Sequence, residues 1–249
     1  MTHYTIRRPM VIALLALALM ASSMACSLFG WRVVRGSGNV VEEEREVAGL
    51  AGVTLNGNGH LTIEKGDTER LRIEAEDNLL PYIEAEVRGG VLELGQQKKV
   101  NLWPRREINY YLTVISLESV TVSGSGRVEA VALEAERFDL TISGSGDAKL
   151  DGVDTEELTV RISGSGKVDI AEGKAHRQDL SISGSGKYAA RDLESTDAQV
   201  RISGSGSAVI RVSDTLDVNV SGSGDVQYLG RPRINQTISG SGTVRAIGD

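Results

Sequence analysis

The chain has 249 residues, with 27 basic and 34 acidic side chains, 29 glycines, four prolines and one cysteine. A single cysteine excludes an intramolecular disulfide and a cysteine-rich metal site, and a formal charge of −7 argues against a nucleic-acid-binding protein, whose surface carries a basic stripe. Glycine exceeds its usual share of about 7%, so unusual backbone geometry is expected, while 40% hydrophobic residues suffice for a folded core.

Residues 1–25 have the pattern of an export signal. Arg7 and Arg8 precede an apolar run of 12 residues that ends at Ala21. This run is shorter than the roughly 20 residues that span a membrane, and it matches the hydrophobic part of a secretory signal. The following Ser-Ser-Met-Ala-Cys sequence, which ends at Cys26, resembles a bacterial lipoprotein box, in which the cysteine receives a lipid and becomes the new N-terminus.

The sequence is compatible with two ways of processing this signal. A lipid on Cys26 would hold the protein at an extracytoplasmic membrane surface, and Ser27 after it favours the outer membrane in a Gram-negative cell. The small residues Ser23 and Ala25 also suit ordinary signal peptidase, which would release a soluble protein. We expect the lipid-anchored form. The mature chain would carry a charge of −9 (25 basic and 34 acidic side chains), so attachment would depend on the lipid.

Internal repeats dominate the rest of the chain. Ser-Gly-Ser-Gly occurs seven times, from Ser123 to Ser239, at spacings of 20 or 18 residues. Polar and apolar residues alternate around each copy, as in Val160-Arg161-Ile162, and the residue directly before the motif is always β-branched. The alternation predicts half-buried strands, and the fixed pitch favours stacked coils, here called rungs, over hairpins. The predicted fold class is therefore all-β, a β-solenoid with Ser-Gly-Ser-Gly corners.

Both residue types of the corner have an expected role. The glycines are expected to supply positive φ angles and to let neighbouring rungs approach closely, so valine at Gly164 or Gly166 should be strained. The serine hydroxyls are expected to bond to one another or to backbone groups of the corner. Arg161 is expected to face solvent, because it lies between two inward residues.

Weaker versions of the repeat occur upstream. Residues 53–61 match residues 120–128 position by position, with Asn-Gly-Asn-Gly as the corner, and residues 34–40 fit the same frame. The 67 residues between the Asn-Gly corner and the first Ser-Gly corner are expected to form about three rungs without the motif. We therefore predict a tether with a first irregular rung over residues 26–45 and one solenoid domain over residues 46–249.

The order of these features resembles a known family. The Asn-Gly corner is followed by Glu-Asp-Asn-Leu-Leu-Pro-Tyr-Ile at 76–83, by Gly-Gly-Val-Leu-Glu-Leu at 89–94 and then by serial Ser-Gly-Ser-Gly rungs. Over residues 46–245 this arrangement is similar to the head GIN domain family of exported bacterial proteins, described as "putative auto-transporter adhesins". The resemblance implies a right-handed, single-stranded parallel β-helix with a non-catalytic surface or envelope role. The family has no established catalytic residues to transfer.

No catalytic, cofactor-binding or metal-binding residues are predicted. Lys167 follows a glycine as in a phosphate-binding loop, but Val168 stands where that loop needs Ser or Thr. Neither His60 nor His176 has a second histidine at helical spacing for a zinc motif, and His60 is expected to be solvated. The outward columns that follow the corner do not place carboxylates on adjacent rungs, which argues against a glycosidase-type acid pair.

One stretch departs from the repeat in an otherwise aromatic-poor chain. Trp103, Arg105, Arg106, Tyr110 and Tyr111 occur within nine residues. Arginine and aromatic residues are enriched at binding hot spots, so these five residues are candidate ligand contacts. The alternative is structural: one of the tyrosines packs inside a strand, and Trp103 covers an end of the core.

The leading functional prediction is a non-enzymatic, lipid-anchored envelope protein with an adhesin-like or structural surface. It is expected to bind no nucleic acid and no cofactor. Its expected partners are the membrane, through the N-terminal lipid, and a glycan or a surface protein. The alternatives are a carbohydrate-binding or polysaccharide-processing protein on the same fold, and a periplasmic interaction module for a membrane partner.

Overall fold

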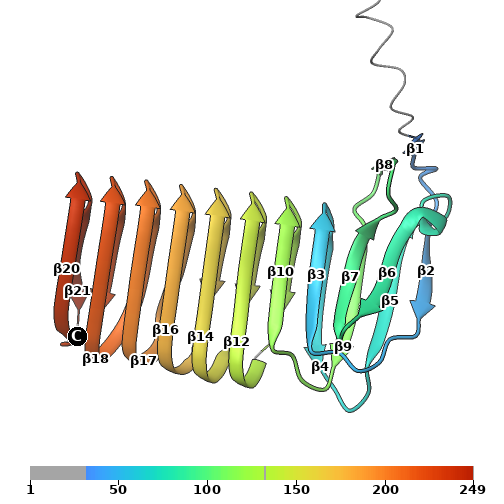
Figure 1. Ribbon diagram of the computed structural model, residues 1–249. Helices are drawn as coiled ribbons and strands as arrows, with labels where there is room; N and C mark the ends of the chain where they lie inside the picture. The colour runs from blue at the N-terminus through green and yellow to red at the C-terminus, as the bar shows by residue number, and fades with distance from the viewer. Residues whose placement is uncertain (1–31, 132, 249) are drawn as a thin grey trace, which may run out of the picture.

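The computed structural model describes residues 32–131 and 133–248. Within these ranges most of the chain is strand, and the strands stack in one long row, with the short 3-10 helix η2 (Leu80–Tyr82) near one end (Figure 1). The predicted signal at residues 1–25 and Cys26 lie outside the described residues. No helix in the described part of the chain is long and apolar enough to cross a membrane.

The Ser-Gly-Ser-Gly repeats form stacked parallel rungs of a β-solenoid, which confirms the predicted fold class. Strands on both sides of each corner pair with the equivalent strands of the neighbouring rungs, so that identical positions face each other, as Ile142 and Ile162 do. The regular strands are β10 (Ser119–Gly124), β11 (Arg127–Ala130), β12 (Leu133–Gly144), β13 (Asp147–Leu150), β14 (Val153–Gly164), β15 (Lys167–Ile170), β16 (Gly173–Gly184), β17 (Lys187–Gly204), β18 (Ser207–Gly222), β19 (Asp225–Leu229), β20 (Arg233–Gly240) and β21 (Thr243–Gly248).

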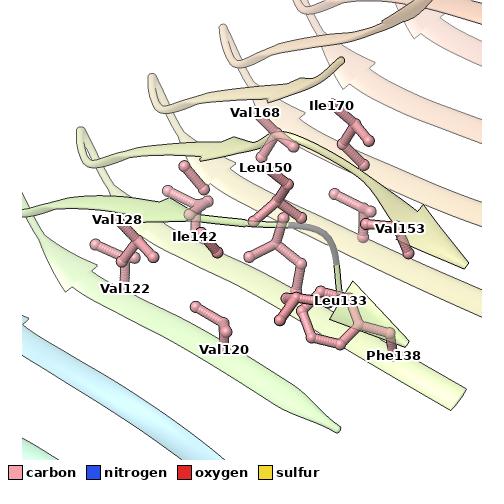
Figure 2. Close-up of a cluster of buried hydrophobic side chains, with 14 of the residues drawn as sticks. Val120, Val122, Val128, Leu133, Phe138, Ile142, Leu150, Val153, Val168 and Ile170 are labelled. Atoms are coloured by element: carbon pink, nitrogen blue, oxygen red, sulfur yellow. The ribbon is translucent and has the colours of Figure 1, made fainter. Parts of the chain in front are cut away.

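The inward side chains form columns along the solenoid and make up its core. Val120, Val122 and Val128 of the first regular rung are fully buried. Figure 2 shows that apolar side chains from facing strands, such as Ile142 and Leu150, meet in the interior. Because each rung buries its apolar face only against the rungs beside it, stability is carried by contacts between neighbours.

One polar pair interrupts the apolar columns. Tyr188 is 2% exposed, and its hydroxyl donates a hydrogen bond of 2.9 Å to Oε1 of the buried Gln178. Burial raises the pKa of Tyr188, so this group stays a neutral donor at physiological pH. The neighbouring rung has the small Ala208 at the position that pairs with Tyr188, which compensates for the large ring.

The two glycines of each corner have different roles: the first adopts a positive φ, and the second leaves room for the neighbouring rung. The first glycine has a φ between 115° and 129° in all seven corners. Its carbonyl accepts a hydrogen bond from the backbone N–H of the second serine of the next rung, as Gly144 does from Ser165 at 2.8 Å. The second glycine does not have a positive φ, so the expected backbone strain at Gly166 is wrong. This glycine is needed because a Cβ at Gly166 would overlap the Ile142 side chain and the carbonyl of Gly146.

The Asn-Gly rung stacks directly on the first Ser-Gly rung, although 67 residues separate the two corners. It consists of β3 (Gly52–Gly57) and β4 (His60–Lys65). Val53 pairs with Val120 and Leu61 pairs with Val128. The position-by-position match of the two segments is therefore confirmed as physical register.

The segment between these rungs forms a single further rung and a cap, so the expectation of three rungs is wrong. β7 (Val91–Gln96) and β9 (Asn109–Val114) pair in parallel with β3 and β4. β6 (Ile83–Arg88) and β5 (Arg70–Glu76) then pair antiparallel with β7 and β9. The turn at Gly89-Gly90, where both φ angles are positive, reverses the chain into a hairpin, so no further coil is added.

The N-terminal segment belongs to this cap. Residues 34–40 do not form a rung: β1 (Arg32–Arg35) pairs with β8 (Val100–Trp103), and β2 (Val40–Arg45) pairs antiparallel with β5. The guanidinium group of Arg45 closes the end of the core by donating hydrogen bonds to the carbonyls of Ile83 and Leu80, at 2.9 and 3.1 Å.

Candidate functional site

A hollow of about 380 Å³ opens at the capped end of the solenoid. Between β7 and β9 the expected corner is missing, and residues 97–108 leave the solenoid, form β8 and return. The hollow lies between this excursion, here called the β8 loop, and the Asn-Gly corner of the adjacent rung. Its polar lining consists mainly of amide and guanidinium groups, with one carboxylate; the residues are Asn56, Asn58, Gln96, Asn101, Arg105, Arg106 and Glu107.

A buried carboxylate holds the β8 loop in position. Glu76, at the end of β5, is fully buried. It accepts hydrogen bonds from the backbone N–H of Arg105 at 2.8 Å and of Gly38 at 2.6 Å. Gly36 leaves room for this carboxylate, because a Cβ at that position would overlap it. Glu76 therefore fixes where Arg105 enters the hollow.

The residues after Glu76 fasten the N-terminal segment. Asp77 accepts hydrogen bonds from the side chains of Ser37, at 2.5 Å, and Asn39, at 2.9 Å. These bonds, with that of Ser37 first, lower the pKa of the Asp77 carboxyl. Asn78 donates to the carbonyl of Arg35 at 2.7 Å. The Glu-Asp-Asn sequence noted in the family resemblance is thus the structural link between β5 and β1.

β1 brings residues to the site that sequence reasoning did not predict. The Arg35 guanidinium lies 5.5 Å from the centre of the Trp103 ring, and that of Arg32 lies 4.9 Å from the Tyr82 ring. Trp103 is 63% exposed, so it does not cover the core as the structural alternative proposed. Nothing in the sequence indicates the pairing of β1 with β8, because the two strands are more than 60 residues apart.

The two candidate tyrosines separate, because adjacent residues of a strand face opposite sides. Tyr110 points inward, is 1% exposed and forms part of the hollow's lining. Burial raises its pKa. Tyr111 is half-buried on the outer face of β9, where the Arg72 guanidinium lies 4.0 Å from its ring centre.

Of the five predicted contacts, the hollow therefore gathers only Arg105, Arg106 and Tyr110. Trp103 lies with Arg35 on the small β1–β8 sheet, and Tyr111 lies elsewhere on the cap. The amide side chains were missed, although the unusual Asn-Gly-Asn-Gly corner was a signal for two of them. Basic residues concentrate on β1 and the β8 loop, where they outnumber the single acidic residue, Glu107; they are Arg32, Arg35, Lys98, Lys99, Arg105 and Arg106.

The carboxylates of the rungs give little support to polysaccharide cleavage. The return strands bring Glu134 and Asp154 into register, a pairing outside the columns considered from sequence. A hydrogen bond from Lys65 at 2.6 Å lowers the pKa of Glu134, the opposite of what a proton donor needs. Within residues 32–131 and 133–248 no three His, Cys, Asp or Glu side chains are grouped to hold a metal.

His60 is less solvated than expected. It lies on the outer face of β4 with its side chain 23% exposed, and its Nε2 atom is 3.6 Å from the Glu129 carboxylate. His60 does not line the hollow, so it adds no acid–base group to the candidate site.

Several solved structures share this fold. A "putative adhesin" from Bacteroides fragilis has a TM-score of 0.78 at 22% identity, and the match covers 86% of this chain and all of that one. A "putative lipid binding protein" from Parabacteroides distasonis has a TM-score of 0.74 at 25% identity, covering 87% of this chain and all of the other. A second P. distasonis structure, a "putative adhesin", has a TM-score of 0.71 at 25% identity over 86% and 100% of the two chains.

A comparison with curated proteins found no match. The family described as "Putative auto-transporter adhesin, head GIN domain" matches residues 49–232. This range includes the hollow, the β8 loop and six of the seven Ser-Gly-Ser-Gly corners. The chain belongs to the head GIN domain family.

Proposed function

We propose that the protein is an exported, lipid-anchored envelope module without catalytic activity, and that it binds an acidic glycan in the hollow beside the β8 loop. The adhesin-type family and the fold support a surface binding role. The observation that carries the ligand class is the lining of the hollow, which gathers amide groups from two rungs with the guanidinium groups of Arg105 and Arg106, against the single carboxylate of Glu107.

The chemistry of this lining matches a sugar acid. Asn and Gln side chains both donate and accept hydrogen bonds, as sugar hydroxyls require. Arginine binds a carboxylate or sulfate through two parallel N–H groups, which adds geometric specificity. Glu76 positions Arg105 through its backbone N–H, so the guanidinium groups are presented from a fixed loop rather than from a mobile one.

The binding prediction concerns the two arginines of the hollow. In titration with an acidic polysaccharide fragment, Arg105→Ala/Arg106→Ala is expected to weaken binding at least about tenfold, because each charge-assisted hydrogen bond is worth roughly 1.5–3 kcal/mol. Lys98→Ala/Lys99→Ala is the matched control, since it removes the same charge from the same loop but not from the lining. Equal losses in the two double variants would show that binding is only diffuse charge attraction.

The anchoring prediction concerns Cys26. Labelled palmitate should be incorporated into the wild-type protein and lost in Cys26→Ala, which should also move the protein from the membrane fraction to the soluble fraction. Label that persists in Cys26→Ala would contradict the lipid anchor. The binding prediction would still stand, because it depends only on the folded residues.

A second candidate ligand for the same end is an anionic lipid headgroup. Trp103 and Val33, which are 63% and 53% exposed, lie among the basic residues of the β1–β8 sheet. Cys26 precedes Arg32 by six residues, a span of at most about 20 Å, so a lipid there would keep this end near the bilayer. Vesicle sedimentation of Cys26→Ala distinguishes the two: lipid binding should depend on Trp103 and Lys98/Lys99, and glycan binding should not.

A further inference from the structure

The two ends of the solenoid are built differently. At one end the rungs are closed by the antiparallel strands β2, β5 and β6, whereas the last rung, β20 and β21, lies at the opposite end (Figure 1). Among the described strands, β20 pairs on one side only, with β18, and β21 pairs only with β19. Within residues 32–131 and 133–248, the eight residues of β20 and the six of β21 therefore have one edge that pairs with no strand.

The edge strands of the capped end carry the usual protection against pairing with another chain. Charged residues occupy four of six positions in β2 and three of six in β6, where Arg88 pairs with Glu86 and Glu93. In β20 and β21 together only Arg233 and Arg245 are charged, and neither strand contains lysine or proline. Natural proteins blunt exposed edges with such residues, so the last rung lacks the devices that the capped end has.

The last rung also leaves part of the core uncovered. Ile234 and Ile238 are 40% and 38% exposed, whereas Leu216 and Val220, which occupy the same columns one rung earlier, are fully buried. A rung stacked on β20 would cover these two side chains and pair its backbone groups. A strand stacked on β20 would thus cover the exposed apolar side chains and pair with the free edge at the same time.

We propose that the last rung docks end to end against the last rung of a second copy of this chain. The sequence of β20 is self-complementary in an antiparallel pair related by a twofold axis through Gln236. In that register Ile234 faces Ile238 of the partner on the core side. On the outer side Arg233 faces a serine, and no like charges are opposed along β20.

Gln236 selects this register among the neighbouring ones. It stands in a column that holds Val218 in the preceding rung, and it is exposed at the end of the solenoid. A shift by two residues would place Gln236 against an isoleucine, whereas on the axis its amide meets an identical amide that can both donate and accept. A single polar group that pairs with itself specifies register in this way.

If the protein is lipid-anchored as proposed, end-to-end pairing would connect molecules on different membrane surfaces. β1, which begins six residues after Cys26, lies at the capped end, so the last rung is at the opposite end of the row from an anchoring lipid (Figure 1). Eight strand spacings separate β7 from β20, about 40 Å at roughly 4.8 Å each. End-to-end pairing would then join copies on two facing surfaces, with many weak contacts adding up.

Sedimentation of the Cys26→Ala chain tests the pairing apart from the anchor. A dimer should form as the concentration rises. Ile238→Lys and the isosteric Gln236→Glu, which opposes two carboxylates on the axis, should each raise its dissociation constant at least about tenfold. Ile115→Lys, at another exposed apolar residue, and Gln227→Glu, whose neighbours in register are Val209 and Arg245, are the controls and should leave it unchanged. A monomer up to about 100 μM, or a dimer insensitive to both end variants, would overturn the proposal.

Cross-linking tests the register. In the Cys26→Ala background, Gln236→Cys places two thiols on the axis, where Cα separations of about 4.5–5.5 Å permit a disulfide. Rapid oxidation to a covalent dimer is expected, and Asn219→Cys, one rung back on the outer face, should stay monomeric. Vesicles that carry the lipidated wild type should cluster and those with Ile238→Lys should not; intact pairing in solution without clustering would refute only the anchored arrangement.

Discussion

Gly164→Val is expected to lower the free energy of unfolding by more than about 2 kcal/mol. Gly164 has a φ of 117°, where a β-branched residue is strained by about 1–3 kcal/mol. Its Cβ would also overlap the carbonyl oxygen of Gly144, which accepts the corner hydrogen bond from Ser165. Urea unfolding followed by circular dichroism measures the change.

A second corner variant separates backbone strain from overlap. Gly166→Val should also destabilise the protein, but only through contact with Ile142 and Gly146, because Gly166 does not have a positive φ. Arg161→Ser, on the exposed face of the same rung, should change stability by less than about 0.5 kcal/mol. Comparable losses at Gly164 and Arg161 would contradict the assignment of inward and outward positions.

Glu76→Ala should have the largest effect on the candidate site. It removes the acceptor for the backbone N–H groups of Arg105 and Gly38, and the loss is expected to be about 2–4 kcal/mol, because two donors lose their partner and a buried cavity opens. Amide hydrogen exchange should rise at both N–H groups and in the β8 loop. Glycan affinity should fall as well, because Arg105 is no longer held in place.

Two further variants check that Glu76 acts through its position. Gly36→Ala leaves the carboxylate in the chain but displaces it, and so should reproduce the faster exchange. Glu44→Ala removes an exposed acid from the neighbouring strand β2 and should stay within about 0.5 kcal/mol of the wild type. Unchanged exchange at Arg105 in Glu76→Ala would show that the β8 loop is held by other contacts.

The candidate site was predictable only in part. The β8 loop was identified because Trp103, Arg105 and Arg106 cluster there, in a chain that is otherwise poor in aromatic residues. Which of these residues line the hollow could not be predicted, because side chains alternate between the two faces of a strand. This alternation separates sequence neighbours such as Tyr110 and Tyr111.

The sequence by itself determined the solenoid, its inward columns and its register. A period of two within each strand and a fixed pitch between corners leave one stacking that turns the β-branched residue before each corner inward, as the pairing of Ile142 with Ile162 shows. The tertiary structure decided the cap and the hollow. Glu76 binds Gly38 and Arg105, which lie 38 and 29 residues away. Such contacts have no period, because each is made once, by a fully buried carboxylate that needs whichever N–H groups the folded chain brings to it.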